Sequence, residues 1–136
     1  MNSSHLRTHG EAVVLIAVGG SLGATLRYVI GATAGESLLL TMLVNATGCF
    51  LLGLLLFDAR AGEYGTKRLR YVFGAGFCAS FTTYSTFVAD VVLSTPLVGL
   101  VYVTASYAAG FGAILASRWV IEIIGESPVR TLPEAD

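Results

Sequence analysis

Four long apolar stretches constrain this chain more than any other feature of its sequence. They cover residues 12–30, 38–57, 71–93 and 96–124, and a helix needs about 20 mostly apolar residues to cross a bilayer. Only 12% of the residues are charged, whereas a soluble domain usually carries about 25%. The sequence therefore predicts an all-α membrane protein with four transmembrane helices.

The 136 residues are expected to form a single membrane domain, 1–136. A polar N-terminal stretch, 1–10, leads into the first apolar stretch without a clear cleavage site. We therefore expect that apolar stretch to be retained as a transmembrane helix. The tail 125–136 contains two prolines and is expected to be frayed.

The basic residues predict an orientation. Four spans place both termini on one side of the membrane, and seven of the eight basic residues fall on that side, with only Arg27 on the other. The cluster of Lys67, Arg68 and Arg70 contributes most of this excess. Because cytoplasmic loops are rich in Lys and Arg, both termini are predicted to be cytoplasmic.

The third stretch is unusual for a membrane helix, because residues 74–87 are crowded with glycines, hydroxyls and aromatic rings. Backbone outside a helix at membrane depth is tolerated only where it is buried in protein or lines a wet cavity. We therefore expect the third helix to be broken in mid-membrane, at the working site. Four helices enclose little space alone, so an oligomer is also expected.

Polar side chains on the second and fourth stretches are candidates for lining an ion pathway. Asn45 costs free energy in hydrocarbon unless it is paired, so it either bonds to another helix or donates an N–H to an anion in a pore. Thr41 lies one turn earlier on the same face, which favours the pore. Tyr102 and Ser106 are also one turn apart, and their hydroxyls either contact an ion or bond to helix backbone.

Two further features suit an anion. Tyr84 and Phe87 share one side if this part of the chain is helical. The edge of an aromatic ring is positive, so these rings either face a small dehydrated anion or pack together. Arg27, near the end of the first stretch, either snorkels to the interface or concentrates anions at a vestibule.

The residues that catalysis needs are scarce, and no enzyme activity is expected. Neither His5 nor His9 has an acidic or cysteine residue at ligand spacing in the sequence, and Asp90 is the exception among acidic residues that otherwise lie in loops, tails or helix ends. No nucleophile–base pair or phosphate-binding glycine loop is present. Cys49 and Cys78 lack a metal-type spacing and are expected to be small buried packing residues. The net charge of −1 gives no sign of a nucleic-acid partner.

Three motifs together resemble the Fluc (CrcB-type) fluoride channel family. They are residues 19–28 (GGSLGATLRY), 45–48 (NATG) and 76–87 (GFCASFTTYSTF). The last is similar to the family's pattern Gly-Phe-Cys-Gly-Gly-x-Thr-Thr-Phe-Ser-Thr-Phe. The match covers nearly all of residues 18–117, and the order and spacing of its motifs make it far more specific than four apolar helices.

The resemblance implies a passive, fluoride-selective channel in the plasma membrane of a prokaryote, where export of F⁻ prevents fluoride toxicity. It implies an antiparallel dimer of four-helix subunits in membrane lipid, with two fluoride pores. A homodimer of this kind requires dual topology, in which copies insert both ways. The resemblance also implies a structural Na⁺ at the dimer interface, held by the backbone carbonyls of Ala79 and Thr82.

The resemblance also assigns roles to side chains. Those that correspond to the family's vestibule and pore are, in chain order, Arg27 (vestibule), Thr41, Asn45, Tyr84, Phe87, Tyr102 and Ser106 (pore). The chain departs from the family at three places. Tyr84 replaces a phenylalanine, Ala79 and Ser80 replace a Gly-Gly pair, and Gly110 and Ile114 leave the polar track of the fourth helix short.

The sequence leaves two alternatives open. Its strong positive-charge bias favours one orientation, so the chain is either half of a homodimer or a partner subunit of a heterodimeric fluoride channel. A small-multidrug-type proton-coupled exporter is also an antiparallel four-helix dimer. Such an exporter needs a carboxylate inside the first helix, where Glu11 lies only at the boundary.

Overall fold

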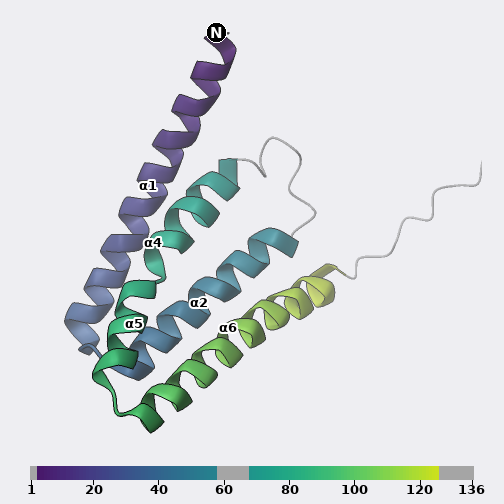
Figure 1. Cartoon of the computed structure of the whole chain (residues 1–136). Coiled ribbons are helices and arrows are strands. Elements are labelled where there is room, and N and C mark those ends of the chain that lie inside the picture. Colours follow the sequence, from purple (N-terminus) through teal and green to yellow (C-terminus); the bar gives the residue numbers. More distant parts are fainter. Residues whose placement is uncertain (1–2, 58–67, 126–136) are drawn as a thin grey trace, which may run out of the picture.

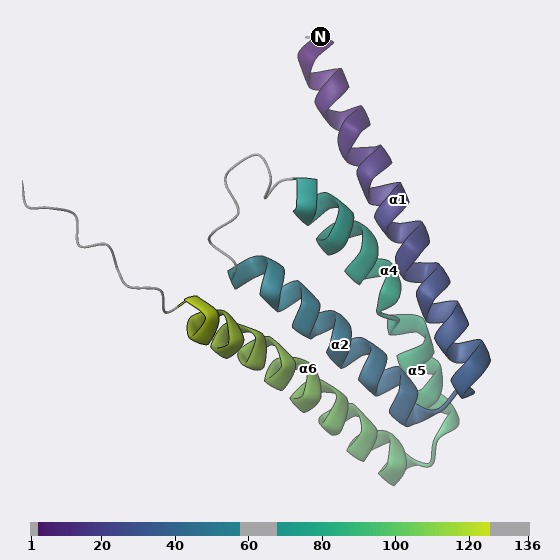
Figure 2. The ribbon, with the colours of Figure 1, turned by 180° about the vertical axis from the view of Figure 1, so that it is seen from behind.

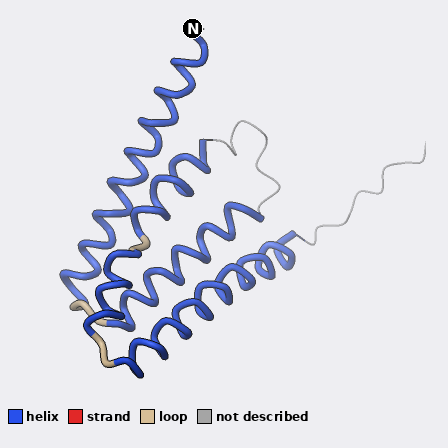
Figure 3. The backbone as a smooth tube through the Cα atoms, in the orientation of Figure 1, coloured by secondary structure: helices blue, strands red, loops and turns tan. Residues whose placement is uncertain are grey.

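The computed structural model describes residues 3–57 and 68–125. In chain order the elements are α1 (Ser3–Ala34), α2 (Leu38–Phe57), the π-helix η1 (Arg70–Cys78), α4 (Ala79–Phe81), α5 (Tyr84–Leu93) and α6 (Pro96–Gly125). Every element in these two ranges is helical (Figure 3). The predicted all-α class is confirmed.

Four spans within the described residues are long and apolar enough to cross a membrane, as predicted. They are His9–Ala34, Leu38–Phe57, Arg70–Leu93 and Pro96–Ile124. The first helix begins earlier than the first apolar stretch, because α1 continues through the polar residues from Ser3 onward. No proline interrupts the helix within these polar residues. The expected frayed tail lies outside the described residues from 126 onward.

The four spans run up and down with short connections at one end (Figures 1 and 2). α1 packs mainly along η1 and α4, while α2 packs mainly along α6. The connection between α1 and α2 turns at Gly35, whose φ of 76° suits glycine. The connection between α5 and α6 leads into Pro96, the first residue of α6. Proline suits this position because the N–H that it lacks would have no acceptor within the helix.

The start of α1 and the end of α6 lie on the same side of the bundle, opposite these two connections (Figure 1). Arg68 lies on that side, where its side chain forms a 2.6 Å ion pair with Glu11 of α1. Arg27 lies toward the opposite end of α1. This placement follows the predicted charge distribution, whereas the orientation relative to the cytoplasm stays a prediction.

Glycines let α1 approach the third span closely. A Cβ added at Gly19 would collide with the carbonyl oxygen of Val72, and one added at Gly76 would lie 2.7 Å from the carbonyl oxygen of Ile16. Small residues at helix contacts are the usual means of packing in lipid, where no hydrophobic force drives helices together. The paired glycines of α1 and η1 therefore fix the distance between these two helices.

Most of the apolar surface of this chain is not covered by the chain itself. Only 11% to 22% of the residues in each span's most apolar window are buried. In a membrane the remaining surface is covered by lipid or by another chain. The core of one chain alone is therefore thin, and α2, η1, α4 and α6 each contribute one buried apolar side chain to it, namely Val44, Cys78, Phe81 and Tyr102.

Substituting alanine for Gly23 is expected to weaken the packing of α1, because the added Cβ would collide with the carbonyl oxygen of Phe77. Overpacking of this kind costs about 1–3 kcal/mol. Thermal unfolding in detergent should show a lower midpoint for Gly23→Ala. Gly112→Ala is the control, because a Cβ there meets nothing within 4 Å. Equal midpoints for the two variants would contradict the packing described.

Candidate ion pathway

The third span is interrupted between α4 and α5. Thr82 (φ −72°, ψ 158°) and Thr83 (φ −140°, ψ 116°) both have extended backbone. The Thr83 side chain caps α5, because its Oγ1 accepts a hydrogen bond from the backbone N–H of Thr86 at 3.2 Å. The Thr83 hydroxyl in turn donates to Thr86 Oγ1 at 2.9 Å. Local hydroxyls thus stabilise the start of α5 within the third span.

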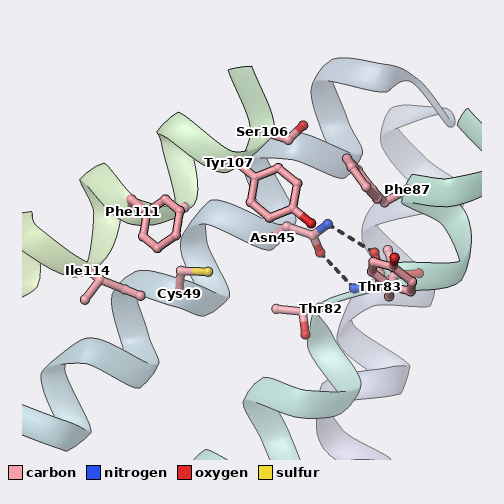
Figure 4. Close-up of a pocket in the computed structure, with 11 residues that line it drawn as sticks. Asn45, Cys49, Thr82, Thr83, Phe87, Ser106, Tyr107, Phe111 and Ile114 are labelled. Atoms are coloured by element: carbon pink, nitrogen blue, oxygen red, sulfur yellow. Dashed lines mark hydrogen bonds between the residues drawn. The ribbon is translucent and has the colours of Figure 1, made fainter. Parts of the chain in front are cut away.

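Asn45 of α2 binds this interruption with both ends of its amide. Its Nδ2 donates to the carbonyl oxygen of Thr83 at 3.1 Å, and its Oδ1 accepts from the backbone N–H of Thr83 at 2.8 Å (Figure 4). Both backbone groups of an extended residue are therefore satisfied by one side chain. The amide keeps a second N–H, because a carboxamide has two donors.

This pairing leaves two backbone carbonyls without their helical donors. In an uninterrupted α-helix the carbonyl of Ala79 would accept from the N–H of Thr83, but that N–H is bound to Asn45. The carbonyl of Thr82 would accept from the N–H of Thr86, but that N–H is bound to the Thr83 side chain. These are the two carbonyls that the resemblance assigns to Na⁺, so their chemistry fits a hard cation.

A cavity of about 370 Å³ opens beside the interruption, between α2, α5 and α6 (Figure 4). Its polar walls are Asn45, Thr82, Thr83 and Ser106. Its aromatic walls are Tyr84, Phe87, Tyr107 and Phe111. We call it the break cavity. It brings together four of the predicted pore residues, and none of the residues that line it carries a charge.

The aromatic rings of the break cavity contact one another. Tyr84 and Phe87 have centroids 5.9 Å apart, and Phe87 also contacts Tyr102 at 5.4 Å and Tyr107 at 6.2 Å. Tyr84 is 73% exposed, so its ring is available to a further ligand or chain. The two predicted pore rings therefore belong to a larger group.

A second cavity, of about 280 Å³, holds the predicted vestibule residue. We call it the Arg27 cavity, and Thr41, Thr83 and Glu36 also line it. The Arg27 Nε is buried and has no hydrogen-bond partner among the described residues. Because Thr83 lines both cavities, the interruption stands between a cavity that contains Arg27 and Glu36 and one that contains no charged residue.

Tyr102 lies outside the walls of both cavities. Its side chain is buried, and its hydroxyl donates to Oδ2 of Asp90 at 3.3 Å. Sequence reasoning noted Asp90 but gave it no role, although a carboxylate within a membrane span is itself a signal of a specific partner. The structure thus pairs a predicted pore hydroxyl with a carboxylate.

Two of the cavity residues were not predicted from the sequence. Tyr107 and Phe111 line the break cavity, and their spacing of four residues on one helix was the available signal. Of the two cysteines, Cys78 is buried as expected, whereas Cys49 is half-buried and lines the break cavity. No cluster of three metal-ligating side chains occurs in residues 3–57 and 68–125.

The family described as CrcB-like protein, Camphor Resistance (CrcB), matches residues 14–118, which include both cavities. The chain belongs to this CrcB-like family. Two related proteins are named fluoride-specific ion channel FluC 1. The one from Haloarcula marismortui is 37% identical over 90% of this chain and 95% of its own length. The one from Natronomonas pharaonis is 40% identical over 82% and 94%.

A third relative, fluoride-specific ion channel FluC 2 from Rhodococcus jostii, is 40% identical over 79% of this chain and 93% of its own length. The similarity therefore extends over nearly the whole of each relative. It includes α2, the interruption and most of α6, the elements that form the break cavity in this CrcB-like chain.

Replacing Asn45 by leucine is expected to destabilise this CrcB-like chain by about 2 kcal/mol or more, because the backbone N–H and C=O of Thr83 would lose their partner. Thermal unfolding in detergent measures the loss. Thr47→Leu on the same helix is the control, because Thr47 is exposed. If the two variants unfold at the same temperature, the pairing between α2 and the interruption does not stabilise the fold.

Proposed function

We propose that this chain is a subunit of a fluoride-selective channel that lets F⁻ leave the cytoplasm passively. The observation that carries the proposal is the break cavity, where neutral N–H and O–H donors and aromatic rings meet at an interrupted membrane span. Membership of the CrcB-like family and relatives named fluoride-specific ion channels support it.

The chemistry of the cavity suits a small anion. F⁻ holds its water tightly, so a pore must replace that water with donors of its own. The second N–H of Asn45 and the hydroxyl of Ser106 are such donors, and both residues line the break cavity. Ring edges add positive potential without a full charge that would hold the ion. The absence of charge among the residues that line the break cavity thus favours release as well as entry.

The Arg27 cavity would supply the anions. A guanidinium at a mouth raises the local concentration of anions, and Arg27 lines this cavity beside Glu36. With a negative potential inside the cell, an open anion path lets F⁻ flow outward. HF enters a prokaryotic cytoplasm as a neutral acid and ionises there to F⁻. Export of F⁻ would protect the cell from this accumulation.

The working unit in this proposal is an antiparallel dimer in the plasma membrane. The low burial of each span leaves surface for a partner. At the interruption, Ala79 is exposed and Tyr84 is 73% exposed, so a second copy can cover this region. Its own rings would then complete the wall of the break cavity.

The proposal includes a structural Na⁺ between the two interruptions. The carbonyls of Ala79 and Thr82 would hold it, because their helical donors are bound elsewhere. The ion would supply positive charge that holds four backbone oxygens together, two from each copy. What this chain contributes is the interruption itself, fixed by Asn45 and Thr83.

A heterodimer is the second candidate, and the distribution of charge favours it. Seven of eight basic residues lie on one side of the predicted topology, which opposes insertion in both orientations. A proton-coupled multidrug exporter has less support. The carboxylate of Glu11 lies near the start of α1 and is paired with Arg68 at 2.6 Å, rather than free within the span.

Purified protein in liposomes loaded with fluoride is expected to release F⁻ rapidly, as followed by a fluoride electrode. Asn45→Asp should reduce the rate at least a hundredfold, because a carboxylate repels the ion and cannot donate to Thr83. Thr104→Val is the control, because that hydroxyl bonds only to Leu100 of its own helix. Efflux from Asn45→Asp at the wild-type rate would refute the role of Asn45.

The same assay separates the two assemblies. Rapid efflux from this chain alone supports a self-sufficient homodimer. Absence of efflux from folded protein, restored when a related subunit is co-reconstituted, supports the heterodimer. Absence of efflux under both conditions would refute the channel proposal.

Replacing Na⁺ by a large organic cation during purification and assay should lower both fluoride efflux and the unfolding temperature. The physical reason is that the freed carbonyls of Ala79 and Thr82 lose the charge that offsets their mutual repulsion. Adding Na⁺ back should restore both quantities, whereas an organic cation at the same ionic strength should not. Identical behaviour in the two cations would argue against the sodium site.

A further inference from the structure

The hydroxyl track along α6 ends early. Ser106 lines the break cavity, but Gly110 and Ile114, which follow it on the same face, carry no polar side chain. Tyr107 and Phe111 line the cavity beside them. Beyond Ser106, these two aromatic residues, Gly110 and Ile114 form the wall that α6 contributes to the cavity.

Tyr107 continues the series of rings that begins at the interruption. Its ring is nearly perpendicular to that of Phe87, at 88° with centroids 6.2 Å apart. On its other side it contacts Phe111 at 6.5 Å. Since Phe87 also contacts Tyr84, the rings form a continuous row from α5 to α6. The edge of an aromatic ring is positive, so this row can present ring edges to a moving anion at successive points.

The hydroxyl of Tyr107 reaches the polar part of the cavity. In Figure 4 it points toward the amide of Asn45, and both residues line the break cavity. It makes no hydrogen bond to any residue of the described ranges. Asn45 uses one N–H for Thr83 and keeps the other. Two donors without a protein acceptor therefore meet in one neutral cavity.

We propose that Tyr107 is a specificity-determining residue, whose hydroxyl forms a two-donor fluoride site with the free N–H of Asn45. Its ring extends the aromatic row toward Phe111, where the hydroxyl track has ended. Short charge-assisted hydrogen bonds favour a small hard anion over a larger one. This inference rests on the proposed function, and it concerns a residue outside the seven pore and vestibule positions named above.

The test compares three variants in the liposome assay. Tyr107→Phe removes only the hydroxyl and should slow fluoride efflux about tenfold, the effect of losing one hydrogen bond to a charged group. Tyr107→Leu also removes the ring and should slow it further. Tyr71→Phe is the control, because Tyr71 lines neither cavity. The unfolding temperature of Tyr107→Phe without fluoride should equal that of wild type, because the lost hydroxyl has no protein partner.

A second measurement tests the site without transport. Unfolding temperatures are compared in sodium fluoride and in sodium chloride at equal concentration. Wild type should show a fluoride-specific rise that Tyr107→Phe reduces and Tyr71→Phe retains. A rise of equal size in wild type and Tyr107→Phe overturns the inference, as does the lack of any rise in wild type.

The two proposals can fail separately. If wild type conducts fluoride and Tyr107→Phe conducts it equally well, the role of Tyr107 is refuted and the channel stands. If wild type conducts nothing but binds fluoride in a Tyr107-dependent way, the donor site stands and transport by this chain alone is refuted.

Discussion

The structure depends on one side chain that satisfies an extended residue inside a membrane span. Asn45 accepts from the N–H of Thr83 and donates to its carbonyl. Water cannot take over these bonds in hydrocarbon, where each unsatisfied backbone group costs several kcal/mol. The third span can therefore leave the helix only where α2 presents an amide. A structural role and a proposed transport role thus converge on Asn45.

The packing of small residues makes this arrangement possible. A Cβ at Gly48, less than one turn after Asn45, would collide with the methyl group of Thr82. On the opposite face, Gly23 of α1 lies against the carbonyl of Phe77. The third span is held between two glycine-lined helices, so its backbone is fixed on both sides. Rigid placement of this kind keeps donors in position when an ion sheds its water.

Much of the fold follows from the sequence, because the bilayer allows few structures. Four apolar stretches of sufficient length predict four helices, and the observed spans begin and end close to the expected residues. The cavity was harder to predict. Asn45, Tyr84, Phe87 and Ser106 meet in it, whereas Tyr102 is bound to Asp90. Helical spacing places Tyr102 and Ser106 on one face, but it does not say which neighbour each contacts.

The sequence by itself determined the all-α class of the protein and the number of its apolar spans. Apolar length and residue chemistry suffice for these, because the hydrocarbon core penalises every other arrangement. Only the tertiary structure decided that both ends of the Asn45 amide bind Thr83, that two carbonyls lose their helical donors, and that Tyr107 faces the same cavity. These features depend on the distance and rotation between helices. Close contacts at glycines set both quantities, and the periodicity along a single helix does not predict them.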